Sequence, residues 1–371
     1  MQDGALRIET IDAPARLHAI APAWRDLAAN AEEPNIFYEP MALLPALALP
    51  AAEGMTCLAA WMPCGERLAG LLPVKRWKRK NPLLPEAIET WEYPLRESAD
   101  PLVRSGCEHA FWKALLPHLD RAPGGFTALR LSKLHADSAT VTALHEVTRS
   151  LGRPLYVTRR YERAALFGGV SPQAYLARLS PKVAREQKRR SKRLAELGAV
   201  TFDRLDGEAD FNAWLDEFLR LEQSGWKGKA GVAAAADPKL AAMLRAMLAE
   251  ALAEGRLDMR RMRVGERTIS MLIHIVTGRS AVSLKIAYDE DYARFSPGVM
   301  LQLEYLDDGL RLERVDSSAR AGHPMFDRIW IDRLPIVSLM VPFNRPAARA
   351  ACAAEQAVRS LAAAVKRRRA R

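Results

Sequence analysis

The chain has 371 residues, more than one hydrophobic core usually holds, so its length predicts two domains. Hydrophobic residues make up 49% and charged residues 27%, which is typical of a globular protein and excludes a disordered or collagen-like chain. The net charge is +11, and residues 366–371 supply +5 of it in what we expect to be a solvated, disordered tail.

The sequence also gives expectations about compartment and metals. It has no apolar run of bilayer-spanning length and no secretory leader, so we expect a cytoplasmic protein without a transmembrane segment. The four cysteines lack metal-ligand spacing and are few for so long a chain, so we expect free thiols and no metal site. The oligomeric state is left open.

Hydrophobic periodicity predicts alternating strands and helices in the first half of the chain. The expected elements are a strand at 6–11, a helix at 14–29, a hairpin of strands at 56–62 and 68–74, a helix at 108–119, and strands at 126–131 and 154–158.

The second half repeats this scheme. The expected elements are helices at 172–179, 182–197, 211–222 and 239–254, a strand at 200–205, and three strands at 257–264, 268–276 and 281–288 that form a meander. The helix at 182–193 carries seven Lys or Arg and one Glu. Because these cations fall on every side, we expect no single amphipathic face.

The last strand of the meander leads into a small-residue turn, Ser296-Pro297-Gly298, and then into a helix from Val299 that should end at Gly309. Serine suits the N-cap of a helix and proline its first position. Unpaired N–H groups and the helix dipole make such a turn suitable for binding an anion. The alternative is that Ser-Pro-Gly is only a helix cap.

The run KIAYDEDYARFSPGVML, from Lys285 to Leu301, resembles the signature of the BioF2-like or CelD-like acetyltransferases, a branch of the GNAT superfamily related to the Fem aminoacyltransferases. A second match runs from Asp316 to Arg333 and includes Gly-His-Pro around His323. The chain lacks the commoner GNAT phosphate motif of Arg or Gln followed by spaced glycines. The resemblance implies tandem GNAT-like domains, each with a mixed, mostly antiparallel sheet flanked by helices (α/β, α+β).

Short internal identities agree with that arrangement. Gly65-Glu66-Arg67 and Gly265-Glu266-Arg267 each join two apolar strands, and each half has a Trp-containing helix before its hairpin. We therefore expect an N-terminal degenerate GNAT-like domain at 1–160, an acyltransferase domain at 161–345, and an Ala-rich helix with a basic tail at 346–371.

The resemblance and the residue types together give candidate site residues. Acyl transfer needs a phosphate cradle, an oxyanion donor and a path for the amine's proton. The candidates are Arg294, Phe295, Ser296, Gly298, Val299 and Met300 for the cofactor, Trp226, Lys227, Lys285 and Tyr288 for the substrate, and Asp316, His323 and Glu222 for catalysis. For several of these the alternative is structural: Trp226 as a core anchor, Arg294 as a solvated turn residue and His323 as a loop histidine.

The resulting hypothesis is an N-acyltransferase that moves an acetyl or other acyl group from acetyl-CoA or another acyl-CoA to a small amine, such as an amino sugar or an envelope precursor. One alternative is a Fem-like transferase that uses aminoacyl-tRNA, because the basic helix at 182–193 could contact phosphates. The other is a non-catalytic nucleic-acid-binding protein, which ranks last because no recognition motif is present.

Overall fold

The structure is a computed structural model that describes residues 5–77, 86–121 and 125–369. Its contacts divide the chain into two units. Unit 1 comprises residues 1–161 and 335–371, and unit 2 comprises Glu162–Leu334. Residues 335–345, which the sequence analysis assigned to the second domain, group with unit 1 because strand β13 (Asp332–Pro342) pairs with β6 (Ala128–His135) there.

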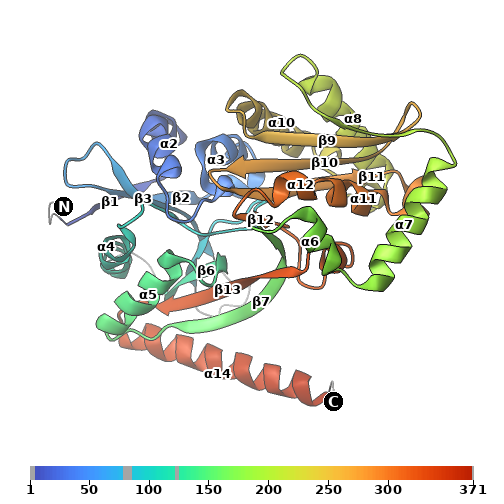
Figure 1. Ribbon diagram of the computed structural model, residues 1–371. Helices are drawn as coiled ribbons and strands as arrows, with labels where there is room; N and C mark the ends of the chain where they lie inside the picture. Colours follow the sequence, from blue (N-terminus) through green and yellow to red (C-terminus); the bar gives the residue numbers. More distant parts are fainter. Residues whose placement is uncertain (1–4, 78–85, 122–124, 370–371) are drawn as a thin grey trace. The chain divides into compact units, whose positions relative to one another are not determined.

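Unit 1 is a mixed sheet with helices on both faces. Its further strands are β1 (Arg7–Ile11), β2 (Met55–Trp61), β3 (Leu68–Trp77), β4 (Ala87–Thr90), β5 (Leu102–Val103) and the start of β7 (Tyr156–Phe167). Its helices are α1 (Pro14–Ala19), α2 (Ala21–Ala29), η1 (Ile36–Tyr38), α3 (Pro40–Ala46), η2 (Pro50–Ala52), α4 (Glu108–Asp120), α5 (Ala139–Ser150) and α14 (Pro346–Arg369). Figure 1 shows α2 and α3 on one side of β1–β3 and α4 and α5 on the other.

Unit 2 has the same kind of sheet. Its strands are the end of β7, β8 (Val200–Arg204), β9 (Leu257–Val264), β10 (Arg267–Thr277), β11 (Ser280–Tyr288) and β12 (Arg314–Asp316). Its helices are α6 (Pro172–Ala177), α7 (Pro181–Ala195), α8 (Phe211–Ser224), α9 (Trp226–Lys229), η3 (Ala234–Ala236), α10 (Pro238–Ala253), η4 (Glu290–Phe295), α11 (Pro297–Glu304), α12 (Leu306–Gly309) and α13 (Phe326–Ile329).

The two sheets repeat one pairing order. In unit 1 the strands follow β1-β2-β3-β4-β6-β13, with three antiparallel pairs, one parallel pair and one antiparallel pair. In unit 2 they follow β8-β9-β10-β11-β12-β7 with the same succession. The turns at Gly65 and Gly265 occupy equivalent hairpins, and Trp24 of α2 and Trp214 of α8 lie on equivalent helices. The tandem arrangement implied by the family resemblance, with which these short identities agree, is therefore present in the fold.

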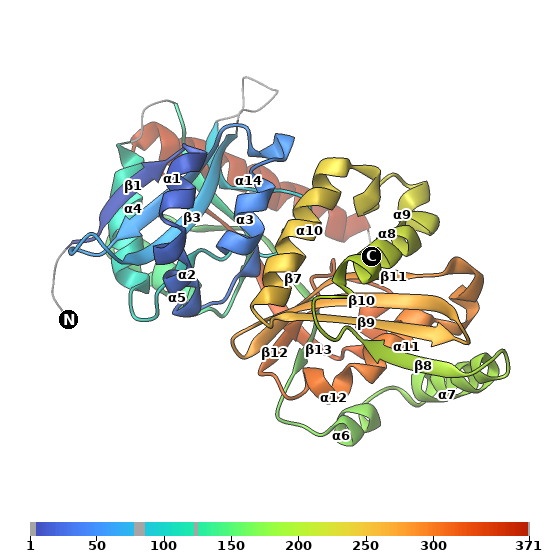
Figure 2. The same cartoon turned by 90° about the horizontal axis from the view of Figure 1, so that it is seen from above.

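The helices of unit 2 cover opposite faces of its sheet (Figure 2). Leu194 of α7 and Leu301 of α11 share one apolar cluster with β9 and β10. On the other face, Trp214 of α8 lies under the guanidinium of Arg261, 4.3 Å from the ring centroid. Together with Leu194, Val183 and Gln187 give α7 one buried face. The expectation that this basic helix has no single amphipathic face is therefore wrong, because its cations leave one stripe free for packing.

Several predicted helices differ in extent. The helix expected at 14–29 is two helices that meet at Ile20, one residue after the first ends and two before Pro22. The helix expected to run to Gly309 is interrupted at Tyr305. Residues 366–369, expected to be disordered, continue helix α14, while 370–371 lie outside the described residues. Among the described residues, no helix combines the length and apolar composition that a bilayer-spanning segment needs.

Candidate functional site

The parallel pair at the centre of unit 2 separates into a fork. Strands β11 and β12 pair only at Ser280–Arg314, Ala281–Val315 and Val282–Asp316. Immediately beyond this point β11 contains an extra residue, because Lys285 pairs with Ile273 of β10 and Ser283 with His274, which leaves Leu284 unmatched. Such a bulge bends a strand and ends its pairing with a neighbour. From residue 283 to 288, β11 therefore has no partner strand on its β12 side in the described part of the chain.

One lysine lies against this open edge. The hydroxyl of Ser270 donates to the carbonyl of Ala287, which therefore faces β10. Successive carbonyls of a strand point to opposite sides, so the carbonyl of Ile286 faces the open side. The ammonium of Lys227 donates to it over 2.9 Å. Lys227 thus occupies one hydrogen-bond acceptor, the carbonyl of Ile286, on the edge where a further strand or an extended ligand would pair.

The carboxylate of Glu222 anchors that lysine and a second one. It lies 3.0 Å from the Nζ of Lys227 and 2.8 Å from the Nζ of Lys285, and it accepts from the backbone N–H of Ala234 over 2.9 Å. Burial alone raises the pKa of Glu222, but the two ammonium groups hold it below its usual value. Burial lowers the pKa of Lys285. Glu222 therefore stays ionised, and it is already engaged by three donors.

The Ser-Pro-Gly turn adopts a strained conformation at the start of α11. Ser296 has φ 56° and ψ 56°, the left-handed region that residues other than glycine rarely adopt. Its side chain does not cap the helix but accepts from the guanidinium of Arg190 on α7. The amides of Val299 and Met300 both donate to the carbonyl of Ser296, so neither is free for the phosphate role expected of it. Within the described residues the Gly298 amide has no acceptor, and it remains available.

A cationic cavity adjoins this turn. Its volume is about 370 Å³, and its lining residues come from α7, the loop after it and the end of η4: Arg189, Arg190, Arg193, Glu196, Leu197, Arg294 and Phe295. Four arginines against one glutamate make the cavity strongly attractive to anions. Arg294 and Phe295 were predicted, whereas the three arginines of α7 were not assigned to this site. The sequence does show these arginines as part of a basic run. No local pattern in the sequence predicts that this run lies beside residue 296.

The carboxylate of Asp316 lies at the end of β12, and it is engaged on both oxygens. One oxygen pairs with the buried guanidinium of Arg163, and the other accepts from the Ser318 amide over 2.9 Å. This turn holds Ser318 at φ 53°, where its hydroxyl is buried without a partner in the described structure. Asp316 therefore shapes the turn that follows the fork.

The ring of His323 is oriented by the backbone that follows it. Its Nδ1 lies 3.3 Å from the Met325 amide and 3.4 Å from the Phe326 amide, and both amides donate. The neutral ring must then carry its proton on Nε2. Burial, with the charges of Arg320 and Lys227, lowers the pKa of His323. At neutral pH the ring is a hydrogen-bond donor through Nε2, and its basic nitrogen is occupied.

Two further predicted residues border the open edge. Trp226 is 53% exposed, so its side chain is not the core anchor that was considered as an alternative. Tyr288 is half-buried at the end of β11, and a Cβ on Gly225 would stand 3.7 Å from its carbonyl. The structure thus brings Trp226, Lys227, Lys285, Glu222 and Tyr288 to one end of β11.

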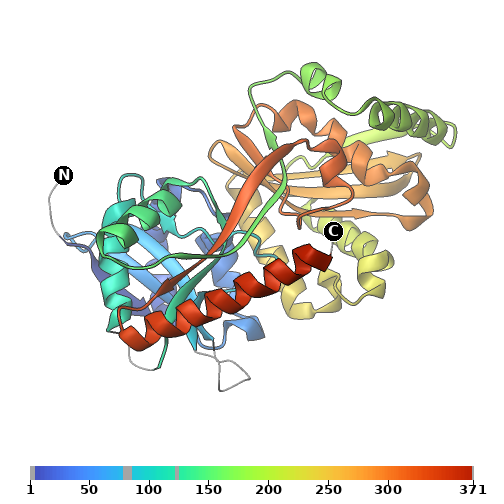
Figure 3. The same ribbon diagram turned by 90° about the horizontal axis from the view of Figure 1, so that it is seen from below.

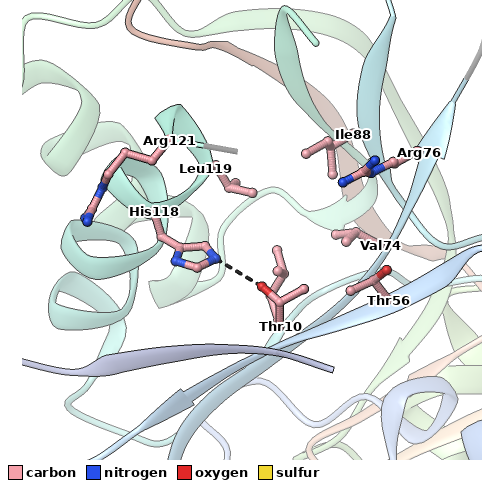
Figure 4. A pocket seen from close by; sticks show the side chains of 9 residues that line it. Thr10, Thr56, Val74, Arg76, Ile88, His118, Leu119 and Arg121 are labelled. Carbon is pink, nitrogen blue, oxygen red and sulfur yellow. Dashed lines mark hydrogen bonds between the residues drawn. The ribbon is translucent and has the colours of Figure 1, made fainter. Parts of the chain in front are cut away.

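Unit 1 contains a separate cavity of about 400 Å³ between its sheet and the last turn of α4 (Figure 4). Its walls are mainly apolar, with Arg76 and Arg121 among the lining residues and His118 bonded to Thr10 over 3.1 Å. None of the predicted site residues lies there. In the described residues of both units, no three His, Cys, Asp or Glu side chains are grouped to hold a metal ion.

Comparison with known proteins agrees with this geometry. Residues 181–316 match the family model of the acetyltransferase (GNAT) domain. The fold is similar to that of FemX, with a TM-score of 0.54 and 10% sequence identity over 86% of this chain and 95% of that chain. It is also similar to a conserved protein of unknown function from Bacteroides thetaiotaomicron, with a TM-score of 0.57 and 12% identity over 91% of this chain and 100% of that chain. A third similar structure is the C-terminal domain of a protein described as a lysylphosphatidylglycerol synthetase from Agrobacterium fabrum, with a TM-score of 0.51 and 11% identity over 92% of this chain and 96% of that chain. A search of curated proteins finds no significant match.

The forked parallel pair, the helix that starts beside it and the family match define unit 2 as a GNAT domain. The chain therefore contains a GNAT acetyltransferase domain, and its fold is similar to that of FemX.

Proposed function

We propose that the protein transfers an acetyl or other acyl group from acyl-CoA to the amine of a small acceptor, and that unit 2 carries the reaction. The observation that carries the proposal is the proximity of three features in unit 2. A Cβ at Gly298, at the start of α11, would stand 3.2 Å from the side chain of Ile286 on the open edge of β11, and the cationic cavity adjoins the turn before α11. An extended thioester arm that ends in phosphates has the charge and length to use all three.

In this proposal the cofactor's phosphates bind at the Ser296 turn. Arg190 already holds the Ser296 hydroxyl, and Arg189, Arg193 and Arg294 supply further positive charge around the cavity. The dipole of α11 and the Gly298 amide add to the attraction for an anion. Guanidinium groups suit phosphate because their paired N–H groups match its oxygens.

The acyl arm would lie along the open edge of β11, with its thioester near Ile286. The acceptor nitrogen attacks the thioester carbonyl, a C–N bond forms, the C–S bond breaks, and CoA leaves as the thiolate. Unpaired N–H groups of the strand edge face the carbonyl oxygen as it becomes an anion. Lys227 adds a positive charge at the same edge.

The acceptor is proposed to enter on the side of α8 and α9. Exposed Trp226 offers a flat apolar surface there, and Lys227, Lys285 and Glu222 together carry a net charge of +1. Because Glu222 is held by three donors, we assign it an anchoring role rather than that of the base. His323 is assigned as a donor, so the proton lost by the amine passes to water.

The described residues of unit 1 do not offer a free helix N-terminus at the corresponding position. Its helix α4 stands where α11 stands in unit 2, but its first residue is Glu108, whose carboxylate accepts from the Gly106 amide over 2.9 Å. An anion of the protein already occupies that helix N-terminus. This supports a non-catalytic, degenerate role for unit 1.

One observation favours the Fem-like alternative with aminoacyl-tRNA as donor. Arg185, Lys188 and Lys192 are exposed on α7 and do not line the cavity. A polyanion larger than CoA would contact cations both inside and outside the cavity. Substitutions at different positions of α7 can therefore distinguish binding of acyl-CoA from binding of aminoacyl-tRNA.

The test compares two triple variants of α7 that each remove three charges. Changing Arg189, Arg190 and Arg193 to Gln should weaken acetyl-CoA binding, measured by calorimetry, by at least roughly tenfold, since hydrogen bonds to charged groups are worth about 1.5–3 kcal/mol each. The matched control changes Arg185, Lys188 and Lys192 to Gln and should bind acetyl-CoA like the parent.

Equal acetyl-CoA affinity in all three proteins would contradict the cofactor site. If instead both variants lose aminoacyl-tRNA binding, with a salt slope of about 0.7–0.9 log units per lost contact, the Fem-like donor replaces acyl-CoA. Glutamine keeps the helix intact because its helix propensity matches that of Lys and Arg.

A further inference from the structure

Helix α14 is held on unit 1 by one face of its first half. Ala348 and Cys352 are buried, and Cys352 packs with Ala128 of β6 and Met340 of β13. The carboxylate of Glu355 pairs with Arg130 over 2.6 Å. These contacts fix the helix without involving its last turns.

The second half of α14 exposes an apolar stripe. Val358 is 66% exposed, Leu361 68% and Val365 50%. Spacings of three and four residues place these side chains on one face of a helix. At about 100° per residue, that face lies about a third of a turn from the face that carries Cys352. Figure 3 shows α14 as one continuous helix, which extends to Arg369. The stripe is therefore not the side that packs on unit 1.

Positive charge extends along the chain beyond the stripe. From Gln356 to residue 371 the sequence contains six Lys or Arg and neither Asp nor Glu. The exposed Arg359 pairs with Glu355 over 2.8 Å, so the remaining cations next to the stripe in the sequence are those of residues 366–369, which follow it directly. An amphipathic helix with aliphatic residues on one face and cations just beyond them is suited to the boundary of an anionic bilayer.

We propose that the C-terminal half of α14 docks reversibly on an anionic lipid surface, with Val358, Leu361 and Val365 entering the headgroup region and the cations contacting lipid phosphates. Charge complementarity selects this occupant. A nucleic acid would use the cations but not the aliphatic stripe, and a second copy of the chain would bring the same positive charge to the contact. The proposal does not depend on the acyltransferase assignment.

The test is sedimentation of the full chain with vesicles at about 0.1 M salt. Vesicles of phosphatidylcholine mixed with phosphatidylglycerol should bind the protein, and vesicles of pure phosphatidylcholine should not. Changing Val358, Leu361 and Val365 together to Gln should lower vesicle binding by about tenfold or more, since each removes buried apolar surface from the bound state. Because these side chains are exposed, the melting temperature should not change.

A matched control changes three other exposed aliphatics, Leu151, Val170 and Leu176, to Gln and should bind vesicles like the parent. Absence of binding to the anionic vesicles overturns the proposal. Unchanged vesicle binding by the stripe variant also overturns it, because charge alone would then explain the binding. If the only change in the stripe variant is loss of self-association, the proposal is likewise overturned, and the stripe binds a second copy of the chain. If RNA is retained equally by parent and stripe variant while vesicles are not bound, the partner is a nucleic acid.

Discussion

Replacing Glu222 with Gln tests the charge cluster at the end of β11. The carboxylate is fully buried, its partner Lys285 is 7% exposed and Lys227 is 23% exposed. The substitution keeps the shape but leaves two partly buried ammonium groups without their counterion. Removing one partner of a buried ion pair typically costs about 3–5 kcal/mol, and the partial exposure of Lys227 favours the lower end, about 3 kcal/mol. Unit 2 should be destabilised by that amount at neutral pH.

The stability that Glu222 contributes to unit 2 depends on pH. The pKa of Glu222 is lowered in the folded state, so its stabilising effect is present above the unfolded value of 4.5 and is lost as pH falls through the lower folded value. The pKa of Lys285 is also lowered in the folded state, so its ammonium opposes folding at neutral pH, and this cost disappears as pH rises from the lowered folded value to the unfolded value of 10.5. Without Glu222 that pKa falls further. The stability deficit of the variant should therefore be largest near neutral pH and shrink toward both acid and alkaline pH.

Hydrogen exchange in denaturant, followed on peptides from 257–288, measures the stability of unit 2 separately, which a two-unit chain requires. The control is Glu290→Gln, which breaks the exposed pair with Lys229 and should produce no measurable change. A Glu222→Gln variant as stable as this control at neutral pH would refute the reasoning. If it were fully stable but inactive, Glu222 would act as the base rather than as an anchor.

Four further outcomes are expected. Arg190→Gln frees the Ser296 hydroxyl and should weaken acetyl-CoA binding by about tenfold in calorimetry, the loss of one charged hydrogen bond. His323→Asn keeps an acceptor for the two backbone amides but loses the Nε2–H group, so kcat should fall about tenfold while KM for the acyl donor stays unchanged. A variant with the kcat of the parent would exclude His323 as a hydrogen-bond donor in the reaction. Ser318→Gly removes a left-handed residue with an unpartnered hydroxyl and should stabilise unit 2 by about 1 kcal/mol in denaturant, whereas destabilisation would mean that the hydroxyl has a partner. Removing 366–371 should leave turnover of a soluble acceptor unchanged, and a large loss would place the tail in the site.

Gly298→Val would not be a clean test of the cofactor site. A Cβ at Gly298 would stand 3.2 Å from the Ile286 side chain and 3.4 Å from the sulfur of Met325, so the residue faces the packed interior. Loss of binding in that variant would report disturbed packing as well as a blocked site.

The sequence by itself determined the local elements of unit 2 and their order. Alternation over 257–288 located the three-stranded meander to within two residues, because strands with one buried face require period two. The Ser-Pro-Gly signature located the start of α11, since proline at the first helical position is a local preference. The identical turns at Gly65 and Gly265 agreed with the repeat that the family resemblance implied, because hairpin turns depend on nearby residues.

Tertiary structure decided what those elements do together. The fork depends on an extra residue at Leu284, which no propensity marks. The left-handed Ser296 and its bond to Arg190 join residues 106 positions apart, and long-range contacts of that kind leave no periodic trace in a sequence. The same holds for Glu222, because only the folded chain places Lys285 and Lys227 beside it. Burial alone would raise the pKa of its carboxyl group, and the two neighbouring ammonium groups lower it instead, so the carboxylate stays ionised and already paired.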